Sequence, residues 1–256
     1  MVERAVLVAI PTYNERENLA EVVGRTRRAA PEAHILVVDD GSPDGTGEIA
    51  DALASGDDHV HVMHRADKQG LGAAYIAAFR WAMERGYGAV VEMDADGSHL
   101  PEELPRLLAA LDGADVVLGS RWVPGGSVVN WPLRRRLLSR GGSFYARIAL
   151  GISVRDVTGG YRAYRSEVLE RVLASDIESQ GYCFQIDMAR RSLDEGFQVV
   201  EVPIQFVERT HGESKMSQGI VLEAMARVTR WGFDHRVDQV RRLVTPSKRQ
   251  APDTLS

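Results

Sequence analysis

Two carboxylates, Asp94 and Asp96, are the side chains best suited to chemistry, and they follow an apolar run that starts at Val90. Residues i and i+2 of an extended chain point to the same side, so both can present oxygens to one hard cation. Two carboxylates that leave coordination positions open suit Mg²⁺ or Mn²⁺ bridging a substrate diphosphate. The pair therefore predicts a metal site, although acidic residues in loops also serve as turn and cap residues.

The segments around this pair alternate between apolar runs and helical patterns. Short apolar runs at 5–10, 34–38, 60–64 and 88–93 predict strands, and helical patterns follow the first three. Unbroken apolar strands that are each followed by a helix predict a mostly parallel sheet with helices on both faces. The sequence thus indicates an α/β fold of the Rossmann-like kind.

Polar clusters follow three of these predicted strands. Residues 12–15 follow the first strand, Asp39 and Asp40 the second, and Asp94 and Asp96 the fourth. Ligands of parallel sheets bind beyond the carboxyl ends of the strands, whereas polar loops placed at random would fall at both ends. We therefore expect the three clusters to form one site.

The second half of the chain is predicted to contain further helices and strands. The elements that we expect there are a helix at 101–111, a strand at 116–118, a loop at 122–132, an amphipathic helix at 133–150, a return to the sheet at 159–164, a helix at 184–195, a strand at 198–203 and one long amphipathic helix from 217. One folded domain is predicted over 1–240. Residues 241–256 are predicted to be a basic and polar tail without fixed structure.

Composition limits the class of protein. A chain of 256 residues is long enough for one large domain, and its single cysteine, Cys183, excludes an intramolecular disulfide and fits a reducing compartment. The N-terminus lacks the pattern of a secretory signal. The longest uncharged run, 122–133, is 12 residues, short of the ~20 that span a bilayer. We expect no transmembrane helices, and a cytoplasmic protein that is soluble or peripheral to a membrane.

The net charge of −5 hides a strongly basic segment. Between Arg121 and Arg147 there are six arginines and no acidic residue. Such a segment on an acidic protein indicates an anionic partner such as a phosphate, a nucleic acid or a membrane surface. A solvated helix face is the alternative.

Other common active-site motifs are absent from the sequence, which has no Walker A, GxGxxG or GxSxG pattern and no His/Cys spacing typical of metals. Gly70 and Gly72 fit either a phosphate cradle at a helix N-terminus or close helix–sheet packing. His99 is expected to be a neighbour of the carboxylates or a turn residue. Cys183 is expected to be a packing residue.

The motifs found so far resemble, in order and spacing, those of the inverting GT-A glycosyltransferases of family 2. The shared motifs are PTYNE at 11–15, DDGSPDGT at 39–46, MDADGSH at 93–99 and GSR at 119–121. Within the family, SRG at 139–141, DVTGGYR at 156–162, Arg209 and GESKMS at 212–217 resemble the dolichol-phosphate and polyprenol-phosphate mannosyltransferases. The resemblance runs over about 5–235, and its first half is shared with glucosyl and aminoarabinosyl relatives.

The resemblance implies a single GT-A domain and a metal-dependent reaction with Mg²⁺ or Mn²⁺. Mannose would pass from GDP-mannose to a polyprenyl (dolichyl-type) monophosphate, with inversion to a β-linked product and release of GDP. Asp94, Asp96 and Arg121 would be the catalytic residues. Because the acceptor phosphate is already an anion, catalysis would rest on positioning and charge neutralisation rather than on a strong general base.

The family pattern also implies roles for individual residues. Those that would line the pocket for base and ribose are Pro11, Tyr13, Glu15, Val37 and Asp39. Those that would bind the donor diphosphate are Asp94, Ala95 and Asp96 through the metal, and Arg121, Arg209 and Lys215 directly. Ser98 would complete the metal ligands, where some relatives have Gln. Arg135 and Ser139, four apart on one helix face, match the acceptor-phosphate pair. Asp187 would recognise a sugar hydroxyl or be structural.

The chain lacks the hydrophobic C-terminal helices of some relatives. Peripheral contact with the cytoplasmic face of the membrane would then rest on residues 122–147, with Trp122, Val128, Val129, Trp131 and Leu133 inserting at the interface, or on a membrane-protein partner. The same stretch also suits a lid over the active site. No nucleic-acid partner is expected.

Three other functions fit parts of the pattern. The nearest is the same transfer with UDP-glucose as the donor. A haloacid-dehalogenase-like phosphatase shares an apolar run followed by Asp-x-Asp-Gly, but that motif usually lies on an early strand, and here three strand units precede it. A non-catalytic module that binds nucleotide sugars or membranes would not need the full set of carboxylates, arginines and lysine.

Overall fold

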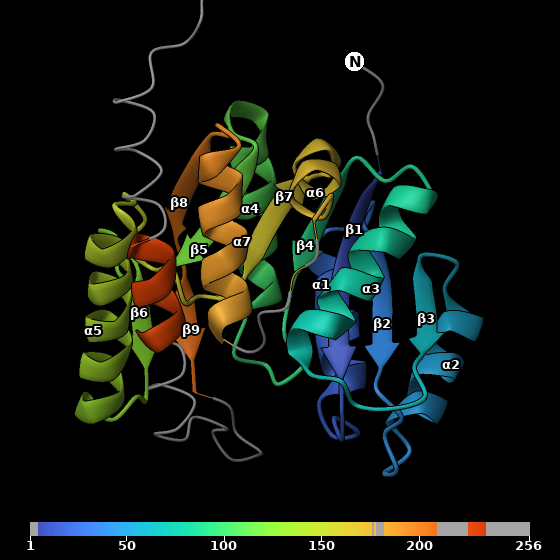
Figure 1. Ribbon diagram of the computed structural model, residues 1–256. Coiled ribbons are helices and arrows are strands. Elements are labelled where there is room, and N and C mark those ends of the chain that lie inside the picture. The colour runs from blue at the N-terminus through green and yellow to red at the C-terminus, as the bar shows by residue number, and fades with distance from the viewer. Residues whose placement is uncertain (1–4, 176, 178–181, 209–224, 234–256) are drawn as a thin grey trace, which may run out of the picture.

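Within the residues that the structure describes, seven strands form one mixed sheet (Figure 1). This computed structural model describes residues 5–175, 177, 182–208 and 225–233. The strands of the N-terminal half are β1 (Val6–Thr12), β2 (His34–Asp39), β3 (Val60–His64) and β4 (Ala89–Glu92). β1 pairs in parallel with β2 and β4, and β2 pairs in parallel with β3, so their carboxyl ends meet at one edge. The parallel arrangement predicted from the apolar runs is confirmed.

The second half of the chain adds β5 (Val116–Ser120), β7 (Arg162–Arg165) and β8 (Val199–Pro203), giving the order β3-β2-β1-β4-β7-β5-β8. β7 is antiparallel to both β4 and β5, whereas β5 and β8 are parallel. Because β7 runs the other way, its first residue lies opposite Glu92, the last residue of β4. The loop before β7 therefore reaches the edge at which β1, β2 and β4 end.

Helices cover both faces of the sheet, as the sequence predicts. One face carries α3 (Leu71–Glu84), α5 (Leu133–Leu150), α6 (Ser166–Val172) and α7 (Tyr182–Asp194). The other carries α1 (Leu19–Ala29), α2 (Thr46–Gly56) and α4 (Leu104–Ala110), with short 3₁₀ turns at Pro101–Glu103 and Leu111–Gly113 beside α4. Successive residues of β1 enter opposite hydrophobic clusters. The strands are apolar throughout because both of their faces are buried.

The region 122–132 is not only a loop, which corrects the sequence-based expectation. Ser127–Val129 forms β6, and it pairs in parallel with β9 (Gln205–Val207) in a small second sheet. The strand is three residues long and lies in a Gly- and Pro-rich stretch, and its partner is far along the chain. No local pattern in the sequence therefore indicates it.

The helix predicted at 133–150 is confirmed as α5, and it lies at one end of the molecule (Figure 1). A helix at 225–233 lies against it, where the hydroxyls of Tyr145 and Thr229 are 2.5 Å apart. The remainder of the long helix expected from 217, and the tail at 241–256, lie outside the described residues. In the part of the chain that is described, no helix is long and apolar enough to cross a membrane.

Among the described residues, Arg162 is the largest side chain with no exposed surface, and it joins three segments near the carboxyl edge of the sheet. Its guanidinium donates to the carbonyl oxygens of Val157, Gly159 and Gln185, each at 2.7 Å. A buried guanidinium is costly unless its donors are satisfied, so these carbonyls and the charge hold one another in place. The contacts tie the loop before β7 to the first turns of α7.

We predict that Arg162→Met lowers the free energy of unfolding by about 3–5 kcal/mol, since three buried carbonyls lose their donor. Denaturant unfolding monitored by circular dichroism measures the change. Arg25→Met is the matched control, because Arg25 pairs with the exposed Glu102 and should cost less than about 1 kcal/mol. Equal losses in the two variants would contradict the role given to Arg162.

Candidate functional site

The two carboxylates of the Asp-Ala-Asp motif lie in a turn beyond the sheet. β4 ends at Glu92, and Gly97 has a φ of +75°, a conformation that favours glycine. The side chain of His99 closes the turn, because its Nδ1 accepts a hydrogen bond from the Asp94 N–H at 2.9 Å. The extended geometry assumed for residues 94–96 is therefore wrong. The turn, and not the strand, sets the positions of the two carboxylates.

His99 supports this turn from beneath. It is 1% exposed, its ring stacks on Tyr161 with centroids 4.9 Å apart, and Phe206 packs edge-on against it. Burial lowers the pKa of His99, although the nearby carboxylates of Asp94 and Asp96 act in the opposite direction. A neutral imidazole has the lone pair that the Asp94 N–H requires. The structure thus gives His99 the role of a turn residue, as the sequence suggests.

Each of the two carboxylates accepts a hydrogen bond from a neighbouring group. The Tyr75 hydroxyl donates to Asp94 at 3.2 Å, and burial followed by the charge of Asp94 raises the pKa of Tyr75, so it stays a donor. Asp96 accepts from the backbone N–H of Ser98 at 3.0 Å. The Ser98 hydroxyl is buried, and within the described residues it has no hydrogen-bond partner.

These three side chains fit a sparsely liganded divalent ion. The described residues contain no group of three or more His, Cys, Asp or Glu side chains that could hold a metal. A site with two carboxylates and one hydroxyl suits Mg²⁺ or Mn²⁺ only if substrate phosphates and water complete the coordination. The donor set therefore fits a metal that binds together with a diphosphate.

Glu92, which the sequence analysis did not single out, lies directly under the turn. It has no exposed surface and accepts a hydrogen bond from the Gln185 amide at 2.7 Å. Burial raises the pKa of Glu92 to about 8, although Arg162 acts in the opposite direction. A charged residue inside an otherwise apolar strand, two positions before Asp94, was the signal available in the sequence.

Asp39 and Asp40, at the end of β2, have different partners. Asp39 accepts from the hydroxyls of Thr12 at 3.1 Å and Ser42 at 2.5 Å, which joins the ends of β1 and β2 to the loop after β2. Asp40 pairs with Arg65 at 2.6 Å. Burial raises the pKa of Asp40, and Arg65 opposes that effect. The structure thus brings together the ends of the first two strands, as predicted.

The other residues expected in the nucleotide pocket differ in how far they are buried. Pro11 and Tyr13 are half-buried at the end of β1, where the Lys68 ammonium lies 3.6 Å from the Tyr13 ring centroid. The N–H of Glu15 donates to the hydroxyl of Thr46 at 3.0 Å. Val37 has no exposed surface and packs in the hydrophobic core. The Val37 side chain therefore offers no exposed surface to a nucleotide.

Arg121 is fixed by a buried carboxylate. Its backbone N–H, Nε and Nη2 donate to Asp156 at 2.6–2.8 Å, and Nη2 also donates to Thr158 at 3.1 Å. Asp156 has no exposed surface, so the pair is a bidentate buried ion pair. Sequence analysis placed both residues in family motifs but did not pair them.

Arg135 and Ser139 lie one turn apart on α5, as the spacing predicts. Arg135 pairs with Glu208 at 2.7 Å, and its guanidinium lies 4.0 Å from the ring centroid of Trp131. The Arg135 Nε, the Ser139 hydroxyl and the indole nitrogens of Trp122 and Trp131 are buried and have no hydrogen-bond partner in the described part of the chain. This region of the site is therefore rich in unused donors.

Phe206, on β9, connects the acidic turn to the arginine region, and no motif in the sequence indicates this role. Its ring centroid lies 5.5 Å from that of His99, 5.2 Å from that of Trp131 and 5.3 Å from the Arg121 guanidinium. The backbone also joins the two regions, since the Val207 N–H donates to the Ser98 carbonyl at 3.2 Å. The acidic and basic clusters thus belong to one site.

Three further expected residues do not add to this geometry. Asp187 is buried on α7 and pairs with Arg190 and Arg191 on the same helix. These contacts support its structural interpretation over sugar recognition. Arg209 and Lys215 lie outside the described residues.

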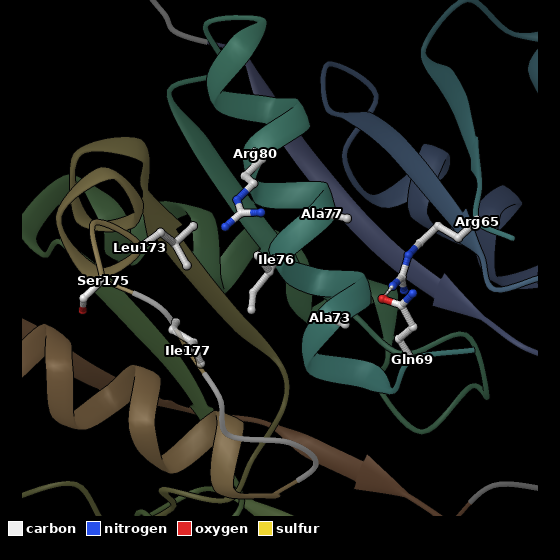
Figure 2. A pocket seen from close by; sticks show the side chains of 9 residues that line it. All are labelled: Arg65, Gln69, Ala73, Ile76, Ala77, Arg80, Leu173, Ser175 and Ile177. Atoms are coloured by element: carbon white, nitrogen blue, oxygen red, sulfur yellow. Dashed lines mark hydrogen bonds between the residues drawn. The ribbon is translucent and has the colours of Figure 1, made fainter. Parts of the chain in front are cut away.

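A separate groove of about 460 Å³ lies along α3 (Figure 2). Ile76, Leu173 and Ile177 form its apolar part, and Arg65 and Arg80 lie on it. Arg65 connects it to the end of β2, through its ion pair with Asp40 and through its backbone N–H, which donates to the Asp39 carbonyl at 2.8 Å. Since none of the predicted site residues lines the groove, we do not assign the reaction to it.

Comparisons with known proteins identify the family of the chain. The family model described as glycosyl transferase family 2 matches residues 7–173. A polyprenol monophosphomannose synthase of Mycolicibacterium smegmatis is 60% identical over 240 residues, which cover 93% of this chain and 91% of the relative. An undecaprenyl-phosphate mannosyltransferase of Micrococcus luteus is 58% identical over 236 residues, covering 92% and 97%.

Solved structures show the same fold. Glucosyl-3-phosphoglycerate synthase of Mycobacterium tuberculosis, in complex with Mn²⁺, UDP and phosphoglyceric acid, is similar with a TM-score of 0.61 at 21% identity, over 93% of this chain and 78% of that chain. A complex of the same enzyme with Mg²⁺ and UDP has a TM-score of 0.59 at 20% identity, over 96% and 82%. At this identity the similarity establishes the GT-A fold alone.

We predict that Glu92→Gln removes a pH dependence of stability. The folded state keeps the Glu92 proton up to a pKa of about 8, whereas the unfolded chain releases it near the ordinary value of 4.5. Wild-type stability should therefore fall as pH rises between these values, by at most about 1.4 kcal/mol per pH unit from this group. Urea unfolding at pH 5, 6.5 and 8 should show a variant that gains on wild type as pH rises.

The exposed Glu170→Gln serves as the control and should follow the wild-type pH profile. Parallel profiles for wild type and Glu92→Gln would contradict a protonated Glu92 in the folded state.

Proposed function

The chain belongs to glycosyl transferase family 2, and on that basis we propose that it transfers mannose from GDP-mannose to a polyprenyl (dolichyl-type) monophosphate. The products are polyprenyl phosphate β-mannose and GDP. The observation that carries the proposal is the 60% identity to a polyprenol monophosphomannose synthase over more than nine-tenths of both chains. The undecaprenyl-phosphate mannosyltransferase supports the same substrate class.

The donor is proposed to bind at the carboxyl edge of β1, β2 and β4. Tyr13 and Glu15 follow β1, and Asp39 at the end of β2 is held in place by Thr12 and Ser42. Asp94, Asp96 and Ser98 would hold Mg²⁺ or Mn²⁺, which supplies positive charge to the diphosphate when it is bound. The buried Asp156 fixes the Arg121 guanidinium, so that its orientation towards the donor phosphates costs little entropy on binding.

The acceptor phosphate is proposed to bind at Arg135 and Ser139 on α5. A phosphate monoester is already an anion at neutral pH, so it can attack the anomeric carbon without first losing a proton. The bond between the phosphate oxygen and the anomeric carbon forms as the bond to GDP breaks, which inverts the anomeric centre. The chain contributes positioning, and Arg121, Arg209 and Lys215 are proposed to neutralise the departing diphosphate.

The other functions are less well supported. The named relatives transfer mannose, which favours GDP-mannose over UDP-glucose as the donor. The family match and the position of the carboxylates after a fourth strand argue against a phosphatase. The assay described below tests both alternatives.

Contact with a membrane is proposed to involve α5. Exposed apolar side chains at one- and two-turn spacings form a stripe on this helix: Leu133, Leu137, Phe144 and Ile148 are 56–70% exposed. The exposed Arg134, Arg136, Arg140 and Arg147 lie beside them on the same helix. An apolar stripe flanked by arginines suits the surface of an anionic bilayer. Trp131, which the sequence analysis expected to insert into the membrane, is 5% exposed and is not available for insertion. We propose that the stripe on α5 makes this contact instead.

We predict that purified protein with Mg²⁺ or Mn²⁺ transfers radiolabelled mannose from GDP-mannose, but not glucose from UDP-glucose, to polyprenyl phosphate. Asp94→Asn and Asp96→Asn should each lower the rate by about 10²-fold or more, because the metal loses a charged ligand. The exposed Asp112→Asn should have wild-type activity.

Thermal unfolding of both variants should match that of wild type, which separates loss of metal from loss of fold. Full activity of either variant would overturn the metal assignment. Transfer of glucose alone, or release of phosphate from generic monoesters, would replace the proposed function by one of its alternatives.

We predict that Phe144→Ser weakens binding to vesicles that contain anionic phospholipid by about tenfold, since one exposed aromatic ring no longer enters the bilayer. Leu71→Ser, at an exposed apolar position on α3, should bind like wild type. Sedimentation with anionic and neutral vesicles measures the effect. A wild-type protein that does not sediment with anionic vesicles would contradict direct contact and favour attachment through a membrane-protein partner.

A further inference from the structure

The ion pair between Arg135 and Glu208 lies at the place proposed for the acceptor phosphate. The Arg135 side chain is 15% exposed and that of Glu208 is 33% exposed, with Nη1 and Oε1 2.7 Å apart. Glu208 directly follows β9, and Arg135 is in the first turn of α5. A carboxylate thus engages the guanidinium that the proposed reaction needs for a phosphate.

The same region contains more buried donors than Glu208 satisfies. The Arg135 Nε, the Trp131 indole nitrogen and the Ser139 hydroxyl are buried, and none has a hydrogen-bond partner among the described residues. An indole N–H and a guanidinium N–H can only donate. Buried donors without acceptors are uncommon in folded proteins and call for an explanation such as an absent ligand. The ligand required is an anion with several oxygens.

Trp131 is well placed to take part in binding such an anion. It is 5% exposed, the Arg135 guanidinium lies over its ring at 4.0 Å, and Phe206 packs against it at 5.2 Å. These contacts fix the ring in one orientation. Its N–H is therefore a preorganised donor beside the cation.

We propose that Glu208 is an internal stand-in for the acceptor phosphate, and that Trp131 is a further phosphate-binding residue. The inference rests on the proposed function. In the resting protein the Glu208 carboxylate neutralises Arg135. The incoming phosphate monoester displaces it, and the additional phosphate oxygens accept from the Trp131 N–H and the Ser139 hydroxyl, for which a two-oxygen carboxylate does not suffice.

The charges of substrate and product make this exchange useful. A phosphate monoester carries a charge of about −1.5 to −2 at neutral pH, whereas the glycosylated phosphodiester carries −1, equal to Glu208. Glu208 therefore competes for Arg135 weakly against the acceptor, which carries more charge, and more strongly against the product. It acts on the reaction through Arg135, as a positioning residue that lets the acceptor in and helps the product leave.

The alternative is that the ion pair only joins β9 to α5. The backbone already makes a connection in this region, since the Glu208 N–H donates to the Val129 carbonyl at 3.2 Å, beside the pairing of β6 with β9. Removing the carboxylate charge should therefore leave the strand in place. A variant at Glu208 should therefore fold, and its kinetics can be measured.

The first test measures steady-state kinetics with a short-chain prenyl monophosphate, which avoids effects of membrane binding. Glu208→Gln should lower the KM for this acceptor by about five- to tenfold, because a neutral amide competes less well than a carboxylate for Arg135. Its kcat should fall as product leaves more slowly, and its KM for GDP-mannose should not change. Glu195→Gln, which breaks the surface pair with Arg171, is the matched control and should leave all three constants unchanged.

Trp131→Phe keeps an aromatic ring and removes the donor. It should raise the acceptor KM by about tenfold without changing the KM for GDP-mannose. An acceptor KM that is unchanged or raised in Glu208→Gln would overturn the stand-in role. An unchanged acceptor KM in Trp131→Phe would overturn the binding role of Trp131.

The second test is independent of transfer. The chain has four tryptophans, so a ¹H–¹⁵N spectrum contains at most four indole signals. The signal that is absent from the spectrum of Trp131→Phe is that of Trp131. Addition of the prenyl monophosphate without donor should shift that signal, and in Glu208→Gln the shift should saturate at lower concentration. Binding without mannose transfer would refute the proposed function and leave this inference standing. Transfer without a shift of the Trp131 signal would refute this inference alone.

Discussion

The donors of the buried Arg162 guanidinium must be satisfied, and much of the site depends on how this is done. Its carbonyl partners come from the loop before β7 and from α7, while Glu92 faces it across the β4–β7 pair. Since a buried guanidinium is costly unless acceptors satisfy its donors, those segments are held in one arrangement around it. That arrangement places Asp156 under Arg121 and Gln185 against Glu92. The antiparallel strand in an otherwise parallel sheet thus delivers the support for the active edge.

The acidic and basic halves of the site are joined by β9. Its pairing with β6 and its backbone contact with Ser98 hold Phe206 between His99, Trp131 and Arg121. In the proposed reaction the donor diphosphate and the lipid phosphate must lie on opposite sides of one sugar. In our proposal the apolar ring of Phe206 lies between the two anion sites and excludes water, which strengthens the electrostatic contacts of both.

Charge in the site is compensated locally before any substrate binds. Asp156 neutralises Arg121, Glu208 neutralises Arg135, and Arg65 neutralises Asp40. The buried Asp156 orients its arginine, whereas Glu208 is more exposed and can be exchanged for a phosphate in our proposal. The difference in burial between the two carboxylates explains how similar ion pairs can serve different purposes.

The sequence alone determined the parallel half of the sheet and the gathering of Thr12, Asp39 and Asp94 at one edge, because strands with two buried faces leave unbroken apolar runs. It also placed Arg135 and Ser139 on one helix face, since helical spacing is local. Tertiary structure alone decided that Asp94 and Asp96 lie in a turn closed by His99, that Val37 is in the core, and that Glu92, Phe206 and Glu208 belong to the site. The turn depends on a single hydrogen bond between residues five apart, and the other features depend on contacts between residues far apart in the chain. Neither kind of contact leaves a periodic pattern in the sequence.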